Sequence, residues 1–507
     1  MAPKTKYDTI FELSRRRGFF WPSYEIYGGL GGFIDYGDLG VKLRRKIDEL
    51  WREFFVRRQG FLELDSPLIN PERVFEASGH LRNFKEYSVT CKRCSASFRV
   101  DHLLEEKTGL ENVEALGGEA MLNMWAEAGI ACPRCGGELG EPELFLTMFK
   151  TEIGSRGGEV GYLRPETAQS MFINFKRGYL YARERLPFAL AQSSKVARNE
   201  ISPRRGLLRL REFTINELEL FFDPLNPGCR WFPEVADLEV KLITEEMEGE
   251  GVEEPLAVSL GRAVEEGLIL TQWQAYFMGV SQRFISALGV PPENQRFRAH
   301  LPEERAHYSA QTYDHEVLLD SWGWVEVSGC AYRTDFDLRS HQEASGQSME
   351  VLREDGSRFI PHVVEPSYGL DRLVYVAMEY AYERREKRNI LRFPREIAPY
   401  QAVVLPLVSK DGVDEKAAKV WEGLVEGGFW VLYDAKGSVG RRYARADEIG
   451  VPLAVTVDYK TLEDETVTLR DRDTWAQVRV ELGRLHQALT DYYHRGLDFS
   501  ALGEPVD

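Results

Sequence analysis

The chain has 507 residues, 43% of them hydrophobic and 29% charged, which is typical of globular proteins and sufficient for about three domains. Its formal net charge of -17 argues against indiscriminate binding of nucleic acid over the whole surface. The sequence has no apolar run long enough to cross a bilayer, and its N-terminus lacks the apolar core of a signal peptide, so we expect a cytoplasmic protein without a membrane segment.

The first elements are a glycine-rich turn and an amphipathic helix. The stretch GGLGGFIDYGDLG at residues 28–40 lacks the GK[ST] ending of a phosphate loop and is interpreted as the approach to a helix. From Val41 onward apolar residues recur at helical spacing, and we expect this helix to end near Gly60. The strand FLELDSPLI follows, and Pro67 predicts that it lies at a sheet edge or a junction.

Four of the six cysteines form two CxxC pairs, Cys91 with Cys94 and Cys132 with Cys135. A tight turn between the members of each pair would let their thiolates converge on one tetrahedral ion. The gap between the pairs is longer than in most zinc ribbons, so the fold of an inserted module would have to bring them together. We predict structural zinc here in preference to free buried thiols.

Residues 187–222 predict a long antiparallel hairpin with a basic loop. Alternation in the second strand places an aromatic residue and two acids, Phe213, Glu217 and Glu219, on one face. The loop arginines are Arg204, Arg205, Arg209 and Arg211, and the first strand ends in Arg198, Asn199 and Glu200. Such a group could hold a nucleotide through charge-assisted bonds to phosphate and stacking under a base. A surface hairpin with a solvated tip is the alternative.

Three further residues are candidates, each with an ordinary explanation beside the functional one. Glu166 precedes a helix that Thr167 can cap, where a glutamate is usually a partner of the helix dipole. Glu326 could ligate magnesium on a nucleotide, or be an unremarkable strand carboxylate. Arg372 lies in the first turn of a helix after residues 363–369, a position that suggests an anionic ligand, although a surface arginine is the alternative.

The remaining regions set the domain organisation. Residues 223–302 are acidic and resemble a helical insertion without a separate core. After Pro399 strands and helices alternate, which predicts a separate α/β domain. Within it residues 436–445, KGSVGRRYAR, carry four basic residues and no acid, so we expect an RNA contact or a solvated charged face.

Three segments together resemble the motifs of class II aminoacyl-tRNA synthetases. The helix with the Pro67 strand resembles motif 1, the Arg198 hairpin motif 2, and GLDR at residues 369–372 motif 3. EIYGGLGGFIDYG, YLRPETAQ, ARNEISPRRGLLRLREFT and EPSYGLDR are similar to segments of the dimeric glycyl-tRNA synthetase family, and the match covers nearly the whole chain.

The resemblance implies an α+β fold, with an antiparallel sheet flanked by helices and a C-terminal α/β anticodon-binding domain. The expected divisions are a catalytic core at 1–85, 161–225 and 303–393, an inserted module with the CxxC pairs at 86–160, a helical acidic insertion at 226–302, and the anticodon-binding domain at 399–507.

The resemblance also implies site residues. For ATP it places Arg198 on the α-phosphate, Phe213 beneath the adenine ring and Arg372 on the terminal phosphate. The other implied ATP residues are Asn199, Glu200, Leu208, Arg209, Leu210, Arg211, Glu212, Glu326, Gly369, Leu370 and Asp371, with Glu326 also binding magnesium. The implied glycine site consists of Arg99, Glu166, Phe213, Thr214, Asn216, Glu217, Glu365, Ser367 and Gly369.

The implied activity is that of a ligase, which activates glycine with ATP to glycyl-adenylate and pyrophosphate and then transfers glycine to the 3′ end of its tRNA. Motif 1 implies a homodimer. Two alternatives stay open: a class II synthetase for threonine or proline, which the YLRPETAQ and EPSYG segments disfavour, and a non-catalytic RNA-binding relative. Such relatives typically lack the arginine of motif 2 or motif 3, and both Arg198 and Arg372 are present.

Overall fold

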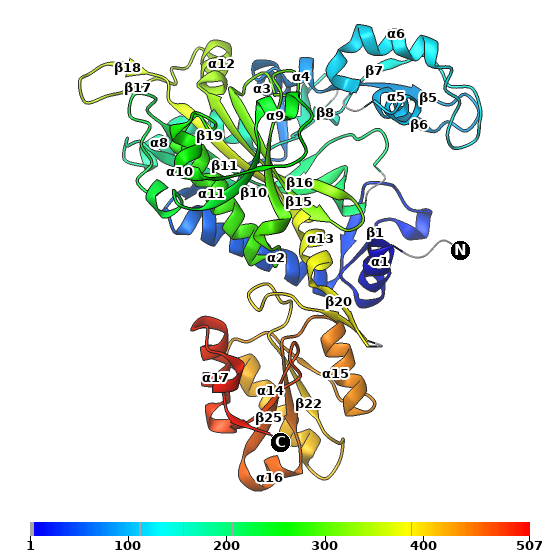
Figure 1. The fold of residues 1–507 in the computed structure, drawn as a ribbon, viewed down its shortest axis with the longest axis vertical. Coiled ribbons are helices and arrows are strands. Elements are labelled where there is room, and N and C mark those ends of the chain that lie inside the picture. Colours follow the sequence, from blue (N-terminus) through cyan, green and yellow to red (C-terminus); the bar gives the residue numbers. More distant parts are fainter. Residues whose placement is uncertain (1–4, 111–112, 156, 204–205, 387, 507) are drawn as a thin grey trace.

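The computed structural model describes residues 5–110, 113–155, 157–203, 206–386 and 388–506. Figure 1 shows a large body, a small module that projects from one corner of it, and a C-terminal unit, coloured orange to red, below it. No helix in these described ranges is long and apolar enough to cross a membrane.

A nine-stranded sheet forms the centre of the body in the described part of the chain. In spatial order its strands are β13 (Leu256–Ser259), β12 (Glu239–Ile243), β14 (Gln295–Ala299), β15 (Gln311–Leu319), β16 (Gly323–Thr334), β19 (His362–Gly369), β11 (Glu212–Phe222), β10 (Phe188–Ala197) and β3 (Leu62–Glu63). Neighbours pair antiparallel except β12 with β14 and β10 with β3. The antiparallel sheet is therefore as predicted, and β3 lies at its edge, as Pro67 suggested. The single strand predicted at 61–69 is wrong, because β4 (Ile69–Pro71) belongs to another sheet.

Helices cover both faces of this sheet. One face packs on α2 (Asp38–Arg52), α11 (Gln272–Ala287) and α13 (Leu370–Ala381), and receives Leu218, Leu220 and Phe222 of β11. The other face packs on α7 (Ala168–Ile173), α8 (Phe175–Tyr181) and α12 (Phe336–Ser345), and receives Phe221. The alternation predicted for β11 is thus correct, but both of its faces are buried.

The prediction of a helical acidic insertion at 226–302 is wrong. This stretch supplies β12, β13 and β14 to the central sheet, and α11 packs in the main core. Its strands are short and its acids crowd the loops and α9 (Glu245–Gly249), which obscured the alternation of buried residues such as Val240 and Leu242 in β12. The prediction that this stretch has no core of its own is correct, because its buried residues belong to the main core.

The cysteine module has a hydrophobic core of its own. It contains the sheet β6 (Ser97–Arg99), β5 (Lys85–Thr90) and β7 (Glu143–Leu146), with α5 (Val100–Thr108) and α6 (Gly118–Ala128) beside it. Its extent is close to the predicted 86–160. However, β8 (Lys150–Ile153) pairs with β9 (Glu159–Leu163), which also pairs with β4 (Ile69–Pro71), so β8 belongs to the body.

The C-terminal unit is an α/β domain, as predicted. Its six-stranded sheet, counted over the described residues, has the order β23 (Val431–Tyr433), β22 (Ala402–Pro406), β24 (Leu453–Val457), β25 (Thr466–Asp471), β26 (Gln477–Glu481) and β27 (Glu504–Pro505). The helices around it are α14 (Val413–Glu426), α15 (Val439–Glu448), α16 (Tyr459–Asp464) and α17 (Leu482–His494). A second hydrophobic cluster stabilises this sheet independently of the body.

Candidate active site

The hairpin of β10 and β11 carries the centre of the site. Its ten residue pairs run from Phe188 opposite Phe221 to Ala197 opposite Glu212, so the strands stay in register along their whole length. β19 lies on the other side of β11 and pairs Glu217 with Ser367. Motif 3 therefore lies directly beside motif 2.

A cavity of about 380 Å³ opens at the loop end of this hairpin. Its lining comes from the hairpin loop, β16 and the junction of β19 with α13. The residues are Arg198, Glu200, Leu207, Leu208, Arg209, Leu210, Phe213, Trp324, Val325, Glu326, Gly369, Asp371 and Arg372. Its size is in the range of nucleotide and drug-sized ligand sites.

Two arginines and one aromatic ring give this cavity the features of a nucleotide site. The Arg198 guanidinium lies 5.5 Å from the centre of the Phe213 ring, and its Nε donates to the Pro165 carbonyl at 3.2 Å. Across the cavity Arg372 pairs with Glu326, Nη1 to Oε2, at 3.0 Å. Burial raises the pKa of Glu326, but the charges of Arg372 and Arg198 outweigh it and leave the pKa below its usual value. Glu326 is therefore an ionised carboxylate between two cations.

The loop that connects the hairpin strands is held by its own arginines. Arg209 pairs with Glu200 at 2.7 Å, and Arg211 donates to the carbonyls of Glu200 and Gly31 at 2.9 and 2.8 Å. Four predicted ATP residues do not line the cavity: Asn199, Arg211, Glu212 and Leu370. Glu212 pairs instead with Lys195, and Leu370 is in the core. The predicted tip residues Arg204 and Arg205 lie outside the described residues.

Sequence reasoning missed the apolar part of the lining, Leu207, Trp324 and Val325. It also missed Glu316, which pairs across the sheet with Glu326 and forms ion pairs with Arg296 and Arg298 at 2.7 and 3.4 Å. Alternation within a strand shows which of its residues share a face. It does not show that β15 and β16 are neighbours, and this is what places Glu316 beside Glu326.

Farther along the same face of β11, Glu217 is fixed by three donors. Thr167 donates to its Oε2 from the backbone at 2.7 Å and from its hydroxyl at 2.6 Å, and Ser367 donates to its Oε1 at 2.8 Å. Thr167 was predicted to cap α7, but its side chain makes no cap bond because it is engaged with Glu217. Glu217 is therefore held in one orientation at the junction of β11, β19 and the start of α7.

A buried arginine, Arg333, organises the acids beside Glu217. It donates to Glu365 at 2.6 Å and makes two bonds of 2.8 Å to Asp337, and it lies 3.6 Å from the centre of the Tyr308 ring. Glu166 accepts from Gln169 at 3.0 Å and lies 3.3 Å from His80 Nε2. The predicted residues Glu166, Glu217, Glu365 and Ser367 are thus part of one buried cluster.

The acids of this cluster differ in their pKa values. Burial raises the pKa of Glu365 well above its usual value, opposed by Arg333 and reinforced by Glu217. For Glu166 the effect of burial is outweighed by the charges of His80 and Arg333, so its pKa is lowered. Arg333, Asp337 and His80 were not predicted, since nothing in their local sequence shows that they are buried together.

Three of the residues predicted for the glycine site lie elsewhere. The side chains of Thr214 and Asn216 project to the opposite face of β11, where Thr214 accepts from Arg44 and Asn216 donates to Asp48 of α2 at 2.8 Å. Arg99 lies in the cysteine module, where it pairs with Glu86 and Asp101 and lines a separate cavity of about 210 Å³. The strand alternation accounts for Thr214 and Asn216, because neighbouring residues of a strand cannot share a face.

The sequence of the chain matches two families of known proteins. Residues 149–381 match the family described as the tRNA synthetase class II core domain (G, H, P, S and T), and residues 401–492 match the anticodon binding domain. A glycine–tRNA ligase of Aeropyrum pernix is 45% identical, with 99% of each chain covered. Those of Methanothrix thermoacetophila and Thermococcus gammatolerans are 41% and 40% identical over at least 96% of each chain. The chain belongs to the glycine–tRNA ligase family.

This family membership makes the chain a class II aminoacyl-tRNA synthetase by sequence, with the α+β core and the anticodon-binding domain that were predicted. The threonine and proline alternatives are thereby set aside, because the full-length relatives are glycine–tRNA ligases.

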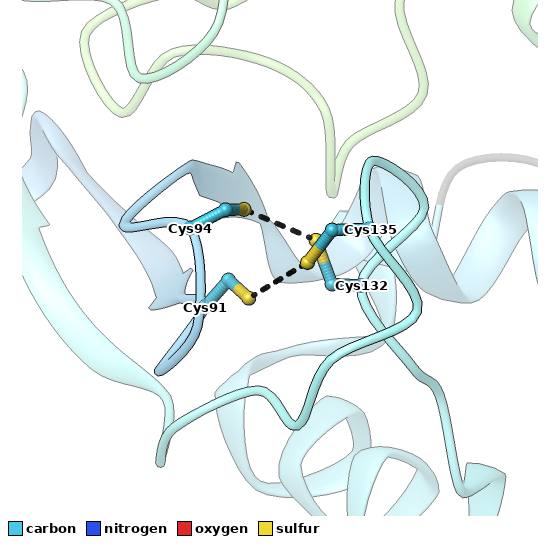
Figure 2. A group of neighbouring side chains, drawn as sticks. All are labelled: Cys91, Cys94, Cys132 and Cys135. Carbon is cyan, nitrogen blue, oxygen red and sulfur yellow. Dashed lines mark hydrogen bonds between the residues drawn. The ribbon is translucent and has the colours of Figure 1, made fainter.

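In this glycine–tRNA ligase family member the four cysteines of the CxxC pairs converge (Figure 2). Cys91 Sγ lies 3.6 Å from Cys135 Sγ, Cys94 Sγ lies 3.7 Å from Cys132 Sγ, and all four sulfurs are within 4.8 Å of one another. Four thiolates around one zinc ion at about 2.3 Å would be about 3.8 Å apart. Backbone N–H donors from Cys94 and Arg93 lower the pKa of the Cys91 thiol to about 6, whereas burial and the neighbouring thiols raise the pKa of Cys135 to about 12.

The basic stretch of the anticodon-binding domain is only partly available to RNA. Arg442 is buried and donates to the carbonyls of Gly437 and Pro406, and Arg445 pairs with Asp434 at 2.7 Å. Arg441 is exposed on α15. The hypothesis of RNA contact therefore applies to Arg441 and not to Arg442, whose bonds hold the domain together.

Proposed function

We propose that the chain activates glycine with ATP to glycyl-adenylate and pyrophosphate, and then transfers glycine to the 3′ end of its tRNA. The observation that supports this most is the layout of β11. Phe213 on this strand lines the arginine-rich cavity, and Glu217, four residues on and on the same face, belongs to the carboxylate cluster. A nucleotide and an amino acid bound at these two places would meet along one strand.

In the nucleotide part, Arg198 and Arg372 would neutralise the phosphates and Phe213 would support the base. Class II synthetases use ATP with magnesium, and the hard, ionised carboxylate of Glu326 fits that ion, with Glu316 paired beside it on β15. Bound magnesium would supply positive charge to the phosphate oxygens. The role of the protein in this step is to align the glycine carboxylate with the α-phosphorus and to stabilise charge with arginine.

In the glycine part, recognition must use the ammonium group and the absence of a side chain. The acids Glu166, Glu217 and Glu365 provide carboxyl oxygens for the ammonium in a buried setting, where a bound cation would favour their ionised form. Ser367, locked onto Glu217, would fill the space where a β-carbon would lie. Exclusion of a methyl group by contact with a rigid wall discriminates better than a hydrophobic pocket, where one methylene gives only about 1 to 3 kcal/mol.

Three finer points are also proposed. The four-cysteine cluster would hold structural zinc, because its sulfur spacings fit a tetrahedral thiolate site. A homodimer through the motif 1 region is supported by β3, an edge strand whose outer side has no described neighbour in the sheet. A cytoplasmic location follows the expectation for an enzyme of protein synthesis.

Glycine-dependent exchange of pyrophosphate into ATP tests the activation step, with each amino acid supplied in turn. Activity with glycine alone is expected, and activity with none would favour the non-catalytic relative. Arg198→Ala should reduce the exchange rate more than tenfold, because a charge-assisted bond to phosphate is worth roughly 1.5 to 3 kcal/mol. The matched control is Arg353→Ala, which removes an arginine paired with Asp223 outside the cavity and should keep normal exchange.

A further inference from the structure

Glu219 is a buried acid of β11 that neither the ATP cavity nor the predicted glycine site uses. It is fully buried, and neither of its carboxyl oxygens has a hydrogen-bond partner among the described residues. Ionising a carboxyl group without donors in such surroundings is very unfavourable. The other acids of the cluster each have at least one donor, so Glu219 is the member that the protein leaves uncompensated.

The sheet places Glu219 against a second acid. It lies two positions after Glu217 on the same face of β11. The register pairs Glu217 with Ser367 and Leu220 with Val364, which sets Glu219 across from Glu365 on β19. Two carboxyl groups directly opposed on neighbouring strands cannot both ionise at low cost.

No cation is reserved for Glu219 among the described groups around it. The charged and titratable groups of the cluster are Glu217 on β11, Glu365 on β19, Arg333 on β16, Asp337 and His341 on α12, Glu166 before α7, His80 on α4 (His80–Asn83), Tyr308 before β15 and Arg164 after β9. The hydrogen bonds of Arg164 go to backbone carbonyls and to the Ser66 hydroxyl. Arg333 is already shared between Asp337 and Glu365. Burial and the charge of Glu365 raise the pKa of Glu219 well above its usual value.

We propose that Glu219 carries a proton in the free protein and releases it when the ammonium group of glycine enters the carboxylate cluster. The ammonium supplies the positive charge that the cluster lacks, the O–H bond of Glu219 breaks, and the proton passes to the buffer. Glu219 acts through Glu217 and Glu365 by setting the net charge of the cluster. It is therefore a positioning residue. The inference rests on the proposed function, because it requires that glycine binds at this cluster.

Titration calorimetry tests the coupling with glycyl-sulfamoyl adenosine, a stable mimic of glycyl-adenylate, in buffers of different ionisation enthalpy between pH 6 and 7.5. The matched control ligand carries a glycolyl group in place of glycyl and has no ammonium. The wild type should release about 0.5 to 1 proton per glycyl ligand and close to none with the control. By linkage, its affinity for the glycyl ligand should rise by up to about tenfold per pH unit.

Glu219→Gln keeps the shape of the side chain but cannot release a proton, so both the release and the pH slope should fall to near zero. If this variant does not fold, Glu219→Met replaces it with an apolar side chain of similar length. Equal proton release by wild type and variant, or glycyl ligand bound by wild type with no proton released, would overturn the inference alone. No binding of the glycyl ligand by the wild type would contradict the proposed function and the inference with it.

Discussion

At the scale of single residues, the acids of the site differ in the number of hydrogen-bond donors that reach their carboxyl groups. Glu217 has three donors, Glu365 has Arg333, and Glu219 has none among the described residues. On one strand, therefore, Glu217 is held by three donors, while Glu219, two positions later, has none in the described part of the chain and is the proposed proton carrier. A donor alone does not decide the state, because burial and the charge of Glu217 raise the pKa of Glu365 well above its usual value despite its bond to Arg333.

The bond from Ser367 to Glu217 gives a prediction for glycine recognition. Ser367→Ala keeps the residue small but removes the donor at 2.8 Å, so one oxygen of a buried carboxylate loses its partner. A lost bond to a charged group costs about 1.5 to 3 kcal/mol, so we expect the KM for glycine to rise at least tenfold and the KM for ATP to stay within about twofold. Steady-state pyrophosphate exchange measures both constants.

The control for this change is Ser193→Ala. Ser193 donates to Asp48 at 2.6 Å from the same hairpin, but toward α2 on the opposite face. Its loss should lower thermal stability and leave the KM for glycine unchanged. A similar rise in KM for both variants would mean that the effect passes through the fold of the hairpin and not through the bond to Glu217.

At the scale of elements, the sequence predicts what depends on local periodicity and misses what depends on neighbours. The hairpin, α2, α13 and the C-terminal alternation of strands and helices followed from spacing alone, and the cysteine spacing predicted the cluster at Cys91. In contrast, β12 to β14 were missed because each is short and flanked by acidic loops. Arg333 was missed for a different reason: Asp337 is only four residues away, but its other partner, Glu365, comes from β19, and no local pattern brings β16 and β19 together.

The cysteine module gives a prediction for metal removal. The module has a small core that includes Cys91 and Cys132, so thiolate and zinc would contribute much of its stability, on the order of 10 kcal/mol. We expect about one zinc per chain by elemental analysis, and a strong chelator should increase hydrogen exchange in β5, β6 and β7 before the central sheet is affected. Cys91→Ser should do the same.

The control for the module is Cys229→Ser, because Cys229 is a buried cysteine in the core of the body, remote from the cluster. It should keep full metal content. Absence of metal from the purified protein, together with an unchanged melting profile in chelator, would rule out a structural zinc site.

At the scale of the whole molecule, the two large units are joined by polar contacts and by Tyr400 and Ile449, which pack against the core of the body. Glu448 at the end of α15 pairs with Arg16 and Arg17 of α1 (Lys6–Arg17), and the Tyr400 hydroxyl donates to Asp38 at 2.7 Å. A cavity of about 370 Å³ lies beside these contacts, lined by both units. A polar, incompletely filled junction is typical of domains that keep some freedom to move. Its contacts would set how the anticodon-binding domain is presented to a tRNA whose 3′ end reaches β11.

Glu448→Gln tests whether this junction serves tRNA and not the first chemical step. The change removes the charge that holds Arg16 and Arg17, and since the Arg16 side chain is 57% exposed, we expect a loss of only about 1 to 2 kcal/mol in docking. Pyrophosphate exchange should stay within about twofold of wild type, because the cavity and the carboxylate cluster lie in the body. The rate of tRNA charging at low tRNA concentration should fall about three- to tenfold. Glu422→Gln, on the exposed face of α14, is the control and should change neither rate. An equal fall in both rates for Glu448→Gln would show instead that the junction is needed to fold the body itself.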